Sequence, residues 1–207
     1  MSDRSFNAVV KTGSQGRLVA KDFIVIAAFT VVMFLFMMVL AIVMSFNTNT
    51  AFATHGIGGI VVGIPWVYLM MRVPKRGAAL ATGALMALVA YLMGMFWTGP
   101  VGMLAGGAVA EAILGLGKRS KAAVIASFAA FVLCWWVGHV SLLLLAGDSY
   151  VEEIVRMGMT REYGEGLVSW SRSPLFFATM AATPVLCALG GLIGTKVFAK
   201  HFSKISR

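Results

Sequence analysis

The stretch FIVIAAFTVVMFLFMMVLAIVMSF, residues 23–46, decides the fold of this chain. It contains no Asp, Glu, Lys or Arg, and about 20 apolar residues are enough for a helix to cross the hydrocarbon core of a bilayer. The whole chain is similar in character, with 59% apolar and 12% charged residues, whereas soluble domains carry about 25% charged residues. The sequence therefore predicts a helical integral membrane protein.

Five more apolar segments follow this stretch. Short polar, glycine-containing or proline-containing connections separate them, and we predict further spans at 56–71, 77–97, 101–116, 122–146 and 174–199. The expected fold is an all-α bundle of six transmembrane helices. Its membrane domain covers residues 23–199, with a cytoplasmic segment 1–22 before it and a basic cytoplasmic tail 200–207 after it.

The positions of Lys and Arg predict the orientation of the bundle, because positive residues concentrate in cytoplasmic loops. All but three of the 17 Lys and Arg residues lie in 1–22, 72–76, 117–121 or close to the C-terminus, and the three exceptions lie in 147–173. We therefore expect both termini in the cytoplasm and 147–173 outside. The net charge of +9 reflects this topology, and we expect no nucleic-acid partner.

The outer segment 147–173 mixes apolar and aromatic residues with acids and is interrupted by glycines. This pattern predicts one or two short amphipathic helices lying on the outer face of the membrane domain. Two interpretations are open. The segment is either an interfacial loop or a lid over an outward-facing pocket.

Glu111 is the only acid inside a predicted span. A carboxylate in hydrocarbon costs roughly 2.5–3.5 kcal/mol on insertion scales, so it must face the bundle interior, be protonated or pair. One interpretation makes Glu111 a ligand-pocket or coupling residue. The other makes it a buried, hydrogen-bonded carboxyl group that fixes helix packing.

Two histidines lie toward the predicted outer side. His55 stands at the mouth of the second span, and His139 lies in the outer half of the fifth span, one turn after Trp135. Neutral imidazole is a common metal ligand, so His55 and His139 are candidate ligands of a metal-bearing molecule such as haem. They have no Cys or acid at ligand spacing, and polar residues near an interface are the alternative interpretation.

Four more side chains complete the predicted ligand-binding set, which also contains His55, Glu111, Trp135 and His139. Asn47 and Asn49 supply directional hydrogen bonds in an uncharged loop. Trp97 and Trp170 lie near the predicted outer interface, where an aromatic belt explains them as well as a stacking pocket does.

The sequence contains no P-loop, H-E-x-x-H or G-x-S-x-G motif. We expect no enzymatic activity and no cofactor other than a bound substrate. An active transporter of this kind would use a separate ATPase. The alternatives are a proton-coupled secondary transporter with Glu111 as proton site, and an intramembrane enzyme using Glu111 and His139.

Several short motifs then occur in a recognisable order. They are KDFIVIAAFT at 21–30, KRGA at 75–78, MGM at 93–95, GGAVAEAIL at 106–114, and the segment 150–166 with its Tyr-x-Glu-Glu beginning and Glu-Tyr-Gly-Glu centre. In this order and spacing the chain resembles the substrate-binding S components of energy-coupling factor (ECF) transporters, and within them the Trep_Strep or MptD-like family. The resemblance covers about residues 18–200.

The resemblance implies six helices in a bacterial plasma membrane and an outward-facing site roofed by loops. It also implies partners, namely one membrane coupling subunit and two ABC ATPase subunits, and a small-molecule substrate such as a vitamin. S components often dock through an Ala-x-x-x-Ala face on the first span. Here Ala27 and Ala28 are followed four residues later by Val31 and Val32, and Ala27 and Ala28 are our docking candidates.

Overall fold

The computed structural model describes residues 16–205, all of whose regular structure is helical. Most of the predicted segment 1–22 and the last residues of the predicted tail 200–207 lie outside the described residues. The helices are α2 (Ala20–Met44), α3 (Thr48–Ala51), α4 (Thr54–Arg72), α5 (Ala78–Leu92), α6 (Thr98–Leu116), α7 (Lys121–Leu145), α8 (Gly147–Arg156), α9 (Arg161–Ser171) and α10 (Pro174–Ile205).

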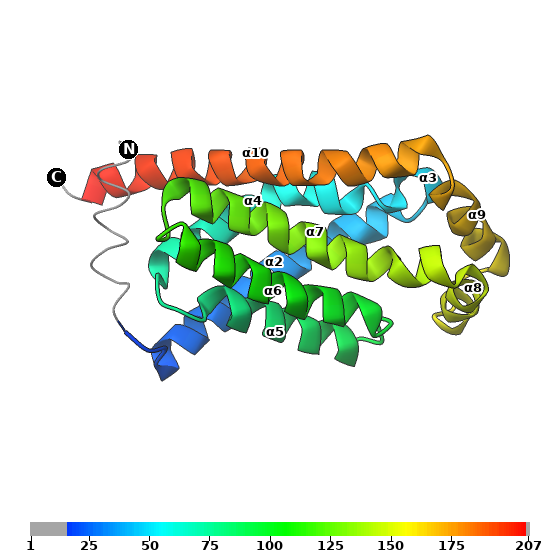
Figure 1. The fold of residues 1–207 in the computed structure, drawn as a ribbon, viewed down its shortest axis with the longest axis horizontal. Helices are drawn as coiled ribbons and strands as arrows, with labels where there is room; N and C mark the ends of the chain where they lie inside the picture. Colours follow the sequence, from blue (N-terminus) through cyan, green and yellow to red (C-terminus); the bar gives the residue numbers. More distant parts are fainter. Residues whose placement is uncertain (1–15, 206–207) are drawn as a thin grey trace.

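Long helices run side by side along the molecule, and α8 and α9 cross one end of the bundle (Figure 1). We call this end the roof end and the opposite end the base end. The first turn of α2 and the last turns of α10 both lie at the base end (Figure 1), as an even number of passes requires. The predicted amphipathic helices in 147–173 are confirmed as α8 and α9.

The expectation of six full-length spans needs one correction. Five helical segments of the described chain are long and apolar enough to cross a membrane, whereas the expected span 77–97 forms the shorter α5, with 15 residues. At 1.5 Å per residue α5 is roughly 22 Å long, less than the roughly 30 Å of a bilayer core. Gly94 follows its end with a φ of 87°, a conformation that glycine adopts readily and other residues rarely.

Glycines let the helices approach closely. A Cβ added to Gly102 on α6 would lie 2.8 Å from the Cα of Gly138 on α7, and one added to Gly63 on α4 would lie 2.5 Å from the carbonyl carbon of Gly190 on α10. Close backbone approach through small residues replaces the hydrophobic effect between helices in lipid. The bundle that results holds the side chains of the roof end at fixed positions.

Candidate ligand-binding site

A cavity of about 300 Å³ lies at the roof end of the bundle. Its walls come from the last turns of α2, the start of α4, the residues after α5, the start of α6 and the second half of α7, and α8 and α9 cover it. Most of the lining is apolar, and six of the lining residues are methionines: Met37, Met38, Met93, Met95, Met157 and Met159.

Two imidazoles meet in the wall of this cavity. Nδ1 of His139 on α7 lies 3.5 Å from Nε2 of His55 in the first turn of α4. The Trp135 ring packs edge-on against the His55 ring, with 5.1 Å between their centroids. His55, Trp135 and His139 all line the cavity, so the structure brings together three residues of the predicted ligand-binding set.

The same wall contains polar atoms that lack a well-aligned hydrogen bond. Nδ1 of His55 and Nε1 of Trp135 are buried and have no partner among the described residues within hydrogen-bond geometry. Leaving a buried donor unsatisfied costs about 1–3 kcal/mol. Buried, unsatisfied polar groups beside an apolar cavity are typical of a site whose ligand supplies the missing hydrogen bonds.

An aromatic cluster of Phe52, Trp136, Trp170 and Phe176 anchors the roof to the bundle. Phe52 stacks on Trp170 of α9 with 5.8 Å between ring centroids and 5° between planes. Phe176 of α10 packs edge-on against Phe52 and Trp170, and it stacks against Trp136 of α7. The cluster ties α9 to α7 and α10. Trp170 therefore supports the roof instead of lining the cavity.

The cavity carries almost no charge. Its lining contains one acid, Glu153 of α8, and no Lys or Arg among the described residues. Oε2 of Glu153 accepts hydrogen bonds from Nε and Nη2 of Arg156, at 2.8 and 2.6 Å. Burial raises the pKa of Tyr150, another lining residue on α8, so its phenol is uncharged at neutral pH. The site therefore suits a ligand with a largely apolar, weakly charged body.

The sequence model of the Trep_Strep family, described as hypothetical bacterial integral membrane proteins, matches residues 20–204. The chain belongs to this family. No curated protein and no solved structure matches the chain significantly. Membership supports a membrane location for this Trep_Strep protein, and the family description names neither a substrate nor a partner.

Besides Trp170, four predicted ligand residues do not line the cavity, and three of them lie near the roof end or in its connections: Asn47, Asn49 and Trp97. Oδ1 of Asn47 accepts a hydrogen bond from the backbone N–H of Asn49 at 2.9 Å and so caps the short helix α3. Both asparagine residues are exposed, and Trp97 is 57% exposed. The Asn47 side chain thus has a local capping role, to which Asn49 contributes only its backbone N–H. The exposed Trp97 fits an interfacial aromatic belt.

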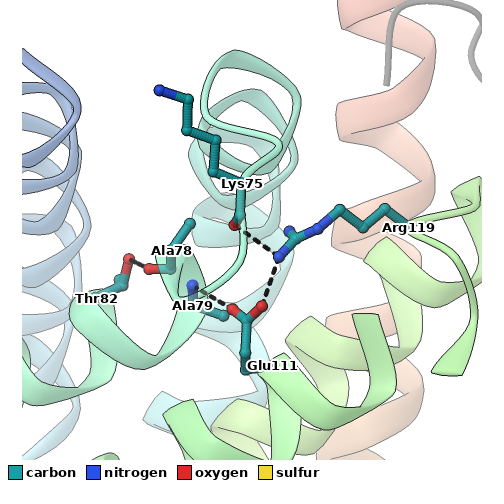
Figure 2. A network of polar contacts seen from close by, with 6 residues as sticks. All are labelled: Lys75, Ala78, Ala79, Thr82, Glu111 and Arg119. Atoms are coloured by element: carbon teal, nitrogen blue, oxygen red, sulfur yellow. Dashed lines mark hydrogen bonds and ion pairs between the residues drawn. The ribbon is translucent and has the colours of Figure 1, made fainter. Parts of the chain in front are cut away.

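Glu111 also lies away from the cavity, in a polar network at the base end (Figure 2). Its Oε1 pairs with Nη2 of Arg119 at 2.5 Å, and its Oε2 accepts from the backbone N–H of Ala79 at 3.1 Å. The same Arg119 nitrogen donates to the carbonyl oxygen of Lys75 at 2.6 Å. This network joins α5, α6 and the α6–α7 turn. The geometry favours the interpretation of Glu111 as a packing residue.

The docking candidates lie on α2. Ala28 is exposed and Ala27 is half-buried. α2 packs against α4 and α5, with a few contacts to α3, and most of its large apolar side chains are exposed. Such a surface is compatible with the docking role that the resemblance implies.

The sequence reasoning linked the methionines in general to a metal chelate but assigned no individual methionine to the site, and it missed Phe52. A signal for four of the methionines was present, because Met-Gly-Met occurs twice, at 93–95 and 157–159. In each case the glycine has a positive φ, of 87° at Gly94 and 89° at Gly158. In each case both methionines line the cavity. The two turns together contribute four methionines to the lining of one cavity.

Proposed function

We propose that this protein is the substrate-binding S component of an ECF-type importer. It captures a small molecule outside the cell and delivers it inward with a membrane coupling subunit and two ABC ATPase subunits. The observation that carries the proposal is the cavity at the roof end, with paired imidazoles in its wall and α8 and α9 across it. The motif order that resembles S components supports the same function.

The cavity indicates the class of substrate. Small-molecule sites typically enclose about 300–1,000 Å³ and combine apolar walls with a few polar groups, and a volume of about 300 Å³ lies at the start of that range. No Lys or Arg is among the described lining residues, so the wall offers no cationic side chain to pair with an anionic group. The substrate that fits is a vitamin or metal chelate with an apolar body.

Energy for uptake then comes from the partners. The sequence has no P-loop, and we propose no catalytic activity for the chain itself. The exposed face of α2 around Ala28 is the surface that we assign to the coupling subunit. It has no large side chain at that position, so another helix can approach closely there.

Affinity purification from the native host in mild detergent tests the proposal. We expect the coupling subunit and two ABC ATPases to co-purify, and the purified complex to drive ATP-dependent uptake in proteoliposomes. Ala28→Trp should abolish the association. Val185→Trp, at a position on α10 that is 67% exposed, is the matched control and should retain it. A protein that purifies alone and supports uptake without ATP would refute the proposal.

The geometry supports the two alternatives less well. A proton-coupled transporter would need Glu111 near its substrate, but Glu111 is paired with Arg119 at the base end. An enzyme using Glu111 and His139 would need both at one place. His139 lies about 18 residues beyond the start of α7, which is roughly 27 Å of helix. Uptake that follows a proton gradient and is lost in Glu111→Gln would favour the first alternative.

A further inference from the structure

The paired imidazoles support an inference about the substrate, which rests on the proposed function. A neutral imidazole has one nitrogen that donates and one that accepts a hydrogen bond. The contact between Nδ1 of His139 and Nε2 of His55 uses one nitrogen of each ring. In the tautomer in which His139 donates, its Nε2 carries a free lone pair. The contact of His139 with His55 is made by Nδ1, so this tautomer leaves Nε2 to face a ligand.

This is the arrangement of a metal-ligating histidine. Such a residue normally makes a hydrogen bond through its second ring nitrogen, which fixes the tautomer and the orientation of the ring. Here His55 is that hydrogen-bond partner. Aromatic rings hold the pair in place, because Trp135 packs against His55 and the Phe52 ring centroid lies 5.9 Å from that of His139.

The surroundings do not suit a bare metal ion. Among the described residues no group of three or more His, Cys, Asp or Glu side chains could hold an ion. Neither imidazole forms an ion pair with a described carboxylate. A cavity of about 300 Å³ is also far larger than one ion requires. The metal must therefore bring most of its own ligands.

The rest of the lining suits a large, polarisable, apolar body. Six methionines line the cavity, and thioethers are soft, adaptable groups that pack well against ring edges. Iron in haem is held in proteins by axial His or Met ligands. We propose that the cavity binds a metal-centred tetrapyrrole of the haem class, with Nε2 of His139 as an axial ligand and His55 as the residue that orients the His139 ring.

Hemin titration of the purified protein in detergent tests this assignment. We expect a saturable shift of the Soret band at one hemin per protein. His139→Ala should lose the shift, and added imidazole should restore it by occupying the space of the missing ring. His55→Ala should bind hemin about 10–100-fold more weakly, as loss of a hydrogen-bond partner does in other metal sites.

His201→Ala is the matched control. His201 is the third histidine of the chain and lies in the last turns of α10, at the base end (Figure 1), so its loss should leave the titration unchanged. His139→Gln, which preserves polarity and approximate size, guards against misfolding of the alanine variant and should also lose the shift. Size-exclusion chromatography of each variant checks that it is folded.

Three results of the hemin titrations would overturn the assignment. They are no Soret shift in the wild type, a shift that survives in both His139 variants, and equal affinity for hemin and metal-free protoporphyrin IX. Binding of copper or zinc ions at the His pair without any tetrapyrrole would overturn it as well. These outcomes leave the importer proposal standing if the ATPases still co-purify. If the chain binds hemin but purifies without ATPases, the ligand assignment stands and the importer proposal fails.

Discussion

Replacing Glu111 by Gln removes one charge from the network at the base end. The Glu111 side chain is 19% exposed and that of Arg119 is 7% exposed, so the guanidinium loses its one ion-pair partner among residues 16–205 while it stays buried. Removing one member of a buried pair costs about 3–5 kcal/mol. Because Glu111 is partly exposed and Arg119 keeps its bond to the Lys75 carbonyl, we expect a loss of about 2–4 kcal/mol in unfolding free energy.

A second Glu–Arg pair in the chain is the matched control. Glu153 and Arg156 on α8 are 2.6 Å apart, close to the 2.5 Å of the Glu111 pair, but the Arg156 side chain is 64% exposed. An exposed pair contributes little, so Glu153→Gln should leave stability almost unchanged. The comparison separates burial from contact distance.

Unfolding in mixed micelles with increasing SDS, followed by tryptophan fluorescence, measures both variants. The double variant Glu111→Leu with Arg119→Met should be less destabilised than Glu111→Gln, because apolar replacement of a whole buried pair leaves no orphaned charge. The reasoning would be refuted if Glu111→Gln and Glu153→Gln unfolded at the same SDS concentration. It would also be refuted if the double variant were less stable than Glu111→Gln.

Three further predictions concern packing, ionisation and the roof. Gly138→Ala should destabilise the bundle by about 1–3 kcal/mol, because an added Cβ would lie 2.6 Å from the Cα of Gly102. In the control Gly115→Ala the added Cβ meets no atom within 4 Å, so this variant should be neutral or more stable by up to about 1 kcal/mol. The same SDS titration measures both variants. Burial raises the pKa of Tyr150 above its usual value of 10.0, so the contribution of its neutral phenol to folding is full at neutral pH and falls as pH rises above 10.0. About one pH unit above 10.0, Tyr150 should be ionised in the denatured protein and neutral in the folded protein. Tyr150→Phe should therefore lower the tyrosinate absorbance of the denatured protein and leave that of the folded protein unchanged. Trp170→Ala removes a stacked ring from the aromatic cluster, and should cost about 2–4 kcal/mol and speed protease cleavage between α8 and α9; an unchanged cleavage rate would contradict the anchoring role.

The helices could largely be predicted from the sequence, because apolar runs of span length have few alternatives in a bilayer. The helix boundaries depend on local backbone conformation, which a hydropathy pattern does not show. α5 ends early at the positive φ of Gly94. α6 begins at Thr98, ahead of the predicted 101, because Pro100 fits the first turn of a helix.

The site could be predicted only in part. His55 and His139 were expected on the same side of the membrane, and the structure brings them into contact. Depth along a span does not reveal lateral position, so the exposed positions of Asn47 and Trp97 could not be derived. The pairing of Glu111 depends on the turn after α6, where Arg119 has a φ of 52°, and no spacing rule shows that geometry.

The two Met-Gly-Met turns have a consequence for how the shape of the cavity can be changed. Both lie outside regular helices and contribute methionines to the cavity, and a Cβ at either central glycine would meet no atom within 4 Å. Met93, Met157 and Met159 are exposed and so are free of the close helix packing that constrains the bundle, whereas Met95 packs against the core. Exchange of these two short segments should reshape the cavity while the membrane scaffold keeps its form. A combinatorial library limited to these turns should therefore alter ligand preference without loss of folded protein.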